Sequence, residues 1–152
     1  MSINALLNQR WQFCHQPLTW RNAIHMACQP LINEHKVNAH YPLHIIDALK
    51  QDSSAFVAGT ATLVVYAKPE HGVISKQGEA AVLKCEKPVV LPDGNKIRMI
   101  ITISASDIQE QNELRRQVIS WLSEKQRSER LLQTTSQPML HKRMTADLHA
   151  AY

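Results

Sequence analysis

The chain has 152 residues, of which 44% are hydrophobic and 20% are charged, and its formal net charge is +4. This length is typical of one domain, and the apolar content is too high for an intrinsically disordered chain. No apolar run reaches the ~20 residues that a membrane-spanning helix needs, and the first residues lack the pattern of a signal peptide. We therefore expect a single domain over residues 1–152, located in the cytoplasm and without membrane insertion.

The cysteines and the charge distribution exclude two further classes of protein. Cys14, Cys28 and Cys85 are odd in number and far apart in the sequence. This usage fits a reducing compartment and predicts unreactive core thiols rather than a disulfide framework. The basic residues between positions 115 and 130 are interleaved with glutamates, which is typical of a solvated helix surface. A nucleic-acid-binding protein gathers positive charge on one face, so we expect no nucleic-acid partner.

The first third of the chain predicts a short strand and two helices. Residues 11–15 alternate between apolar and polar types, as in a half-buried strand. Thr19 is a candidate N-cap for a helix whose apolar face extends to Leu31, with Pro30 expected to kink or fray the last turn. A second helix is expected to begin at Pro42 and to continue through residue 49.

From residue 55 the pattern changes to that of strands. Two short apolar runs, 55–58 and 61–66, are separated by Gly59, which indicates a bend or bulge. Residues 80–83 predict another buried strand. A turn at 92–95 then leads into 97–103, which is apolar enough for an interior position in a sheet.

The last third returns to helical patterns. Asp107 is a candidate N-cap for a long helix with an apolar face over 114–122, and a short helix is expected at 128–132. Residues ~135–152 show little pattern and predict a loosely held C-terminal tail. Because some of the links between strands are short, we expect an α/β fold with a single mixed β-sheet flanked by helices on both faces.

A candidate site follows the expected strand at 61–66, where residues 66–72 read Tyr-Ala-Lys-Pro-Glu-His-Gly. This segment resembles the phosphorylation-site motif of the mannitol/fructose-type enzyme IIA domains of the bacterial sugar phosphotransferase system. That motif reads Pro-His-Ala-Arg-Pro-Glu-x-Gly, and its histidine receives a phosphoryl group from the carrier protein HPr. Segments 19–24, 86–89 and 103–107 also resemble the family, in the same order and with similar spacing over residues ~10–135. The motif positions that match are Ala67, Pro69, Glu70 and Gly72.

The resemblance implies the three-layer fold of enzyme IIA, no cofactor, and a phosphoryl relay from HPr to an enzyme IIB domain in sugar uptake. The chain departs from the family pattern at several positions, beginning with Val65 in place of the motif's first proline. Tyr66 stands at the acceptor position, Lys68 replaces the motif's arginine, and Gln111 falls where a second, helping histidine is expected. Tyrosine is a poor nucleophile at neutral pH without a base, and a glutamine amide does not titrate. Lys68 can still hold a phosphate as a point charge.

Three hypotheses therefore remain open. The chain is a degenerate enzyme IIA without phosphocarrier activity, a non-catalytic regulatory module that binds HPr, enzyme IIB or a regulator, or a small-anion sensor that uses Lys68. Tyr66 is either a packing residue at a strand end or a residue that contacts a ligand or partner. Phosphotyrosine carrier chemistry is disfavoured, because an aryl phosphate ester is too stable to pass its phosphate on.

The remaining histidines carry weaker signals. His71 occupies the variable position of the motif, so we expect a surface histidine that points away from the site. The alternative is that His71 or another histidine has taken over the acceptor role. His40 and His44 are four residues apart with His35 nearby, a spacing that suggests metal ligands. However, Pro42 places His40 outside the regular turn and no cysteine or carboxylate completes the set. We therefore predict no metal site.

Overall fold

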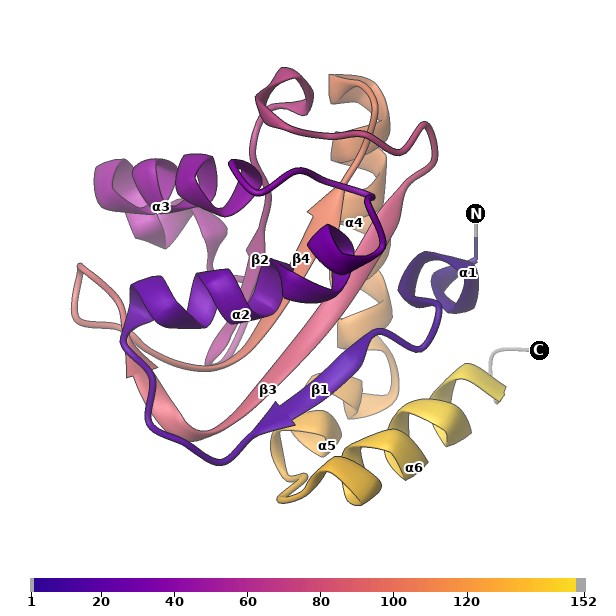
Figure 1. Cartoon of the computed structure of the whole chain (residues 1–152). Helices are drawn as coiled ribbons and strands as arrows, with labels where there is room; N and C mark the ends of the chain where they lie inside the picture. The colour runs from indigo at the N-terminus through magenta and orange to yellow at the C-terminus, as the bar shows by residue number, and fades with distance from the viewer. Residues whose placement is uncertain (1, 150–152) are drawn as a thin grey trace.

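The structure, a computed structural model, describes residues 2–149 and contains a four-stranded mixed sheet (Figure 1). The strands are β1 (Trp11–Cys14), β2 (Thr62–Val65), β3 (Glu79–Val90) and β4 (Lys96–Ser104), in the order β1-β3-β4-β2. β1 is parallel to β3 and β2 is parallel to β4, whereas β3 and β4 are antiparallel. The predicted mixed sheet is confirmed, and residues 97–103 occupy an interior strand as expected.

Helices cover both faces of the sheet, so that the chain forms three layers. In Figure 1, α2 (Trp20–Asn33) and α3 (Tyr41–Asp52) lie in front of the sheet. The other face is covered by α1 (Ile3–Leu7), α4 (Ile108–Ser123), α5 (Arg127–Leu132) and α6 (Gln137–His149). Among the described residues, no helix is long and apolar enough to cross a membrane.

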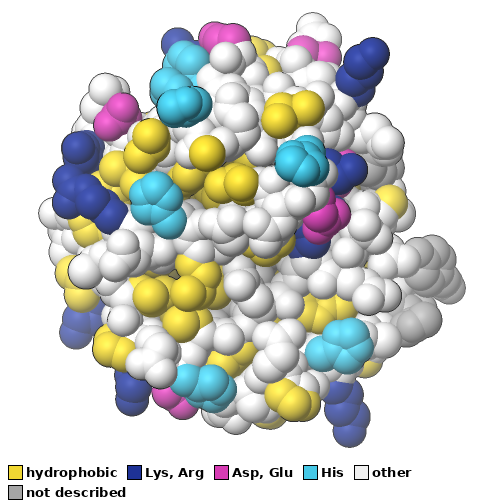
Figure 2. Space-filling model, in the orientation of Figure 1, with side chains coloured by type: hydrophobic (Ala, Val, Ile, Leu, Met, Phe, Trp, Pro, Cys, Tyr) yellow, Lys and Arg dark blue, Asp and Glu magenta, His cyan; other side chains and the backbone are white. Residues whose placement is uncertain are grey.

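Side chains of the two central strands, β3 and β4, contribute to two separate hydrophobic cores, one on each face of the sheet. On β3, Ala81 and Leu83 point into the core under α2 and α3, whereas Ala80 and Val82 point into the core under α4. A strand buried on both faces has no polar side, which explains the continuous apolar runs in the sequence. Figure 2 shows the outer surface over α2 and α3, where hydrophobic side chains gather and Lys and Arg lie mainly around the margin.

Local signals in the sequence explain where several elements begin and turn. The Thr19 hydroxyl accepts a hydrogen bond from Asn22 N (3.2 Å), and an Asp107 carboxylate oxygen accepts one from Glu110 N (2.8 Å). Both predicted N-caps are therefore confirmed. The turn before β4 uses Gly94 at φ +90°, a conformation that favours glycine.

The predicted strand at 55–58 is wrong. Residues Ser53–Phe56 form a 3-10 helix, η1, and only an isolated bridge joins Val57 to Leu63. Ala55 is exposed, so this short apolar run does not have the buried pattern of a strand. Periodicity alone cannot distinguish a four-residue strand from a helical turn.

The prediction of a loosely held tail is also wrong for residues 137–149, which form α6; residues 150–152 lie outside the described part of the chain. Leu140, Met144 and Leu148 of this helix are buried in the second core. Gln137 fixes the start of α6 on the edge strand, because its Oε1 accepts from Phe13 N (2.7 Å) and its Nε2 donates to Trp11 O (3.2 Å). These contacts join residues that are far apart in sequence.

The three cysteines lie in the interior, as predicted. Cys14, Cys28 and Cys85 are free and buried. Burial raises the pKa of the Cys28 thiol to about 12 and that of Cys85 to about 11. Because the thiolate is the reactive form, both are unreactive at neutral pH.

Candidate functional site

The topology brings the motif segment and the start of α4 to one edge of the sheet. β2 and β4 are parallel neighbours, so their carboxyl ends meet at the edge drawn at the top of Figure 1. The motif loop (residues 66–72) follows β2 directly, and α4 follows β4. Crevices outside the carboxyl ends of strands are the usual ligand sites of open α/β sheets.

Two buried side chains hold the peptide groups of Ala67. Gln111 Nε2 donates to Ala67 O (2.7 Å), and Ala67 N donates to the Tyr41 hydroxyl (3.2 Å). That hydroxyl in turn donates to Ile103 O (2.7 Å), and burial raises its pKa well above the usual range, so it remains protonated. Gln111 is only 5% exposed, and its amide is therefore a fixed structural donor to the motif loop.

The far end of the motif loop is fastened to the segment between α2 and α3. Asn38 N donates to Gly72 O (2.8 Å), and Ile74 N donates to Lys36 O (2.9 Å). Gly72 has φ +123°, and a Cβ there would lie 2.5 Å from Asn38 Oδ1. Both the backbone conformation and the limited space therefore favour glycine at this position.

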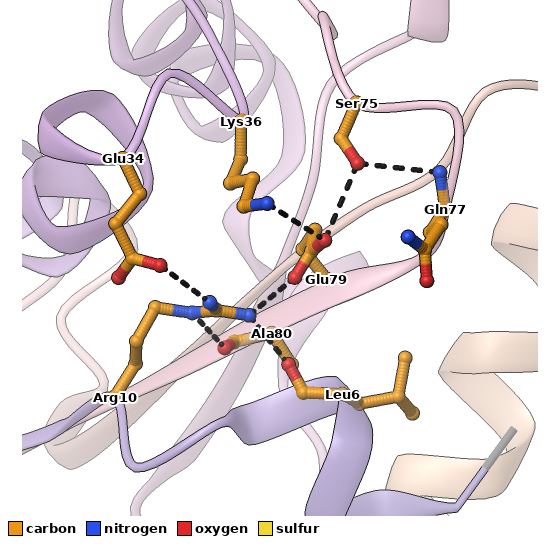
Figure 3. A network of polar contacts seen from close by, with 8 residues as sticks. All are labelled: Leu6, Arg10, Glu34, Lys36, Ser75, Gln77, Glu79 and Ala80. Carbon is orange, nitrogen blue, oxygen red and sulfur yellow. Dashed lines mark hydrogen bonds and ion pairs between the residues drawn. The ribbon is translucent and has the colours of Figure 1, made fainter.

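An ion network secures the chain just beyond the motif loop (Figure 3). Arg10 is buried and contacts Glu79 (2.5 Å) and Glu34 (3.0 Å), while also donating to two backbone carbonyls. Glu79 also accepts from the Ser75 hydroxyl (3.2 Å) and pairs with Lys36 (3.6 Å). Loss of either Arg10 or Glu79 would leave the other charge buried and unpaired, which is energetically costly. The network therefore fixes the position of the chain just beyond the motif loop. The sequence did not indicate it, because Arg10 and Glu79 are 69 residues apart and carry no motif.

A solvent-open hollow of about 390 Å³ lies against the motif loop. Tyr66, Lys68 and Gln111, all predicted site residues, line it together. Tyr66 is half-buried and packs on Phe56 with ring centroids 5.2 Å apart, whereas Lys68 is exposed. The remaining lining residues are Ala67, Phe56, His71 and four residues of α3 or its C-terminal end: His44, Asp47, Ala48 and Gln51. The other motif residues, Pro69, Glu70 and Gly72, shape the loop without lining the hollow.

The expectation that His71 points away from the site is wrong. His71 lines the hollow and stacks on His44, with ring centroids 4.1 Å apart and an interplanar angle of 16°. The 3-10 turn η2 (Pro69–His71) accounts for this position of His71, because it turns the chain toward α3. Within this turn His71 N donates a hydrogen bond to Lys68 O (2.9 Å). Only the packing of α3 on the sheet brings His44 here, and no local signal in the sequence indicates that pairing.

The chemistry that these groups offer is hydrogen-bond donation and positive charge. Lys68 is a cation, the two imidazoles carry N–H donors, and Tyr66 contributes a hydroxyl. Asp47 is the carboxylate of the lining. Within residues 2–149 no group of three His, Cys, Asp or Glu side chains is arranged to hold a metal ion.

Comparisons with known proteins agree with this architecture. The sequence profile described as "Phosphoenolpyruvate-dependent sugar phosphotransferase system, EIIA 2" matches residues 6–145. The chain therefore belongs to this enzyme IIA family. A search of curated proteins found no match.

Solved structures of phosphotransferase-system IIA proteins share the fold over nearly the whole chain. A protein described as the IIA component PtxA of Streptococcus mutans has a TM-score of 0.84 at 18% identity, covering 99% of this chain and 95% of its own. The mannitol-specific cryptic enzyme IIA CmtB of Escherichia coli has a TM-score of 0.79 at 18% identity, covering 95% of this chain and 99% of its own. A complex of the Escherichia coli mannitol enzyme IIA with phosphorylated enzyme IIB has a TM-score of 0.72 at 18% identity, covering 91% of this chain and 95% of its own. At these identities the likeness establishes the fold alone.

Proposed function

We propose that this protein is a degenerate enzyme IIA of the bacterial phosphotransferase system, which acts in the cytoplasm and docks on its partners without relaying phosphate. Tyr66 occupies the acceptor position and Gln111 the helper position in this proposal. The observation that carries it is that the buried side chain bonded to Ala67 O is the amide of Gln111, which has no titratable atom left to assist a phosphoryl transfer.

The chemistry of the two residues supports the loss of the relay. A phosphorylated imidazole has a nitrogen leaving group and passes its phosphate on, whereas a tyrosine phosphate is a stable aryl ester. An amide cannot accept a proton from the Tyr66 hydroxyl, so Gln111 does not activate it. Lys68 can still attract a phosphate as a point charge.

The surface around the motif loop supports a protein partner. Leu43 at the start of α3, Ile74 just after the motif loop and Ile108 at the start of α4 are 47%, 55% and 50% exposed. These large apolar side chains belong to elements that meet at the edge of the sheet carrying the loop, and we propose that they contribute to an interaction surface there. The enzyme IIB domain is the proposed partner, since a relative of the same fold is seen in complex with one. HPr and a regulatory protein are the further candidates for this face.

Label transfer tests the proposal. The protein is incubated with enzyme I, HPr and labelled phosphoenolpyruvate, and the label is tested for acid lability. Wild type is expected to take up none. Tyr66→His should gain a little label, and Tyr66→His with Gln111→His should gain more, because the second imidazole positions the first and stabilises the incoming charge.

The matched control is Tyr66→His with Gln109→His, which adds a second histidine at an exposed position of α4. It should label no better than Tyr66→His alone. Strong acid-labile labelling of wild type would contradict the loss of the relay. No label on any variant would contradict retention of the docking surface.

A further inference from the structure

A second cavity lies between α1, α4 and α6, on the other side of the sheet from α2 and α3. Its volume is about 330 Å³, and its walls include Ile3 of α1, Leu148 of α6 and the C-terminal half of α4. It shares no lining residue with the hollow at the motif loop. Trp121, in its wall, lies ten residues beyond Gln111, which is about 15 Å along a helix. The cavity is therefore a separate place on the molecule.

Trp121 brings to this cavity a buried donor that has no acceptor. The residue is 5% exposed, and its Nε1 has no hydrogen-bond partner within the described part of the chain. By contrast, Trp11 Nε1 donates to His141 Nδ1 (3.0 Å). Buried N–H groups of folded proteins nearly always have a partner, and an indole nitrogen can only donate. A bound molecule with an acceptor oxygen beside the ring would satisfy this group.

Arg127 fixes the parts of the cavity wall next to this donor. Its side chain is buried, its guanidinium lies 4.8 Å from the centroid of the Trp121 ring, and its Nη1 donates to Trp121 O. The same Nη1 lies 3.6 Å from Glu124 Oε2. The indole and the carboxylate are thus held by one buried group. Such preorganisation lowers the entropy cost of binding a ligand.

The charges of the wall favour a neutral ligand. Glu124 is the only charged side chain among the described residues that line the cavity, and its pairing with Arg127 offsets its charge. The lining contains no cation, which disfavours a phosphate or another anion. The Ser120 hydroxyl and the amides of Asn4 and Gln117 also line the cavity, and these groups both donate and accept hydrogen bonds. Hydroxyl groups of a ligand match this set, because they also do both.

We propose that this cavity binds a small neutral polyhydroxylated molecule, a polyol or a monosaccharide, one of whose hydroxyl oxygens accepts from Trp121 Nε1. The volume lies at the lower end of the ~300–1,000 Å³ found for small-molecule sites, as a ligand of this size requires. Ile3 and Leu148 offer apolar contacts to its carbon atoms. The inference goes beyond the proposed function and does not depend on the fate of the phosphoryl relay.

The test follows the indole N–H signals of the full chain by proton–nitrogen NMR while xylitol, mannitol, glucose or a hexose phosphate is added. The chain has 3 Trp, and Trp121→Phe identifies the signal of Trp121. That signal should move saturably with at least one neutral compound, with a dissociation constant of about 1 mM. The signals of Trp11 and Trp20 should stay in place. The hexose phosphate should bind at least tenfold more weakly than the neutral compound.

Two serine variants of α4 locate the site. Ser120→Leu places an apolar side chain in the wall and should weaken binding at least tenfold. Ser123→Leu is the matched control, because Ser123 is exposed on the same helix and does not line this cavity, and it should bind as wild type does. Unchanged Trp11 and Trp20 signals show that each variant is folded.

Three results would overturn the proposal. The first is a Trp121 signal that does not move with any neutral compound, or that moves only together with the other two indoles. The second is full binding by Ser120→Leu, which would place the site elsewhere. The third is equal binding of the hexose phosphate, which would contradict the choice of a neutral ligand.

Discussion

Gln111 combines a structural contact to the motif loop with an amide group that does not titrate. Its Nε2 donates to Ala67 O, a bond that one imidazole nitrogen could also make. An imidazole would have a second nitrogen left for the phosphoryl group, whereas the amide has no titratable atom. The geometry of the motif loop is therefore compatible with the proposed loss of the relay. The resemblance to the family located this position by the spacing of residues along the chain. It could not indicate the hydrogen bond from Gln111 to the motif loop.

Gly72 tests how tightly the motif loop is held. We expect Gly72→Ala to lower the free energy of unfolding by roughly 2 kcal/mol, through the strained φ and the contact with Asn38 Oδ1. Gly59→Ala is the control, since Gly59 also has a positive φ but has nothing within 4 Å of a Cβ. Urea unfolding of both variants measures the difference. Equal losses would show that the contact with Asn38 does not constrain the loop.

Lys84 is a buried lysine whose ammonium group contacts a backbone carbonyl and an aromatic ring. It is 0% exposed, its Nζ donates to Cys85 O (3.2 Å), and the Phe13 ring lies 5.2 Å away. Burial, with the charge of Arg98, lowers the pKa of its ammonium group. We expect Lys84→Met to raise the free energy of unfolding by roughly 1 kcal/mol at pH 7, because an apolar side chain avoids the desolvation cost.

The pH dependence of this gain gives a second check. The folded-state pKa lies below the unfolded value of 10.5, so the folded protein gives up its proton first. The cost of burying the ammonium is present at low pH and vanishes as pH rises toward 10.5, so the advantage of Lys84→Met should shrink over that range. Lys87→Met, at an exposed position on the same strand, should change stability little at any pH. A gain for Lys84→Met that is independent of pH would contradict burial of the charged form.

At the scale of elements, the sequence predicted those whose signals are local. The helices α2 and α4 have a capping residue and an apolar stripe, and both begin where Thr19 and Asp107 predict. α6 was missed because its amphipathic pattern is weak and its anchors, Trp11 and Phe13, belong to a strand more than 120 residues earlier. Its formation depends on tertiary contacts rather than on local propensity.

Gln137 is the residue that tests this explanation of α6. Its side-chain amide pairs with Trp11 O and Phe13 N along the open edge of β1, as a neighbouring strand would. We expect Gln137→Ala to cost about 1–2 kcal/mol of stability and to speed hydrogen exchange at the Phe13 amide. Gln133→Ala, at an exposed position before α6, is the control. Unchanged exchange at Phe13 would show that the edge is protected by other means.

For the molecule as a whole, only some of the residues that form the candidate site could be predicted from the sequence. The motif and its spacing identified Tyr66, Lys68 and Gln111, which do share one hollow. The spacing of His44 suggested only a metal ligand, and nothing in the sequence indicated its pairing with His71 or the Arg10–Glu79 network. Both depend on contacts between elements that are far apart in the chain. The same framework that positions a relay in the family is thus proposed to support binding without transfer.

The central claim, docking without transfer, is tested most directly by competition in a reconstituted relay. Enzyme I, HPr, a working mannitol-type enzyme IIA and its enzyme IIB are supplied with labelled phosphoenolpyruvate, and this protein is added in excess. We predict that label reaches enzyme IIB more slowly as the concentration of this protein rises, because it occupies enzyme IIB without delivering phosphate. A double variant with Leu43→Asp and Ile74→Asp, which places charge on the proposed apolar surface, should lose this inhibition. If the protein instead supported transfer after the working enzyme IIA was omitted, the claim would be contradicted.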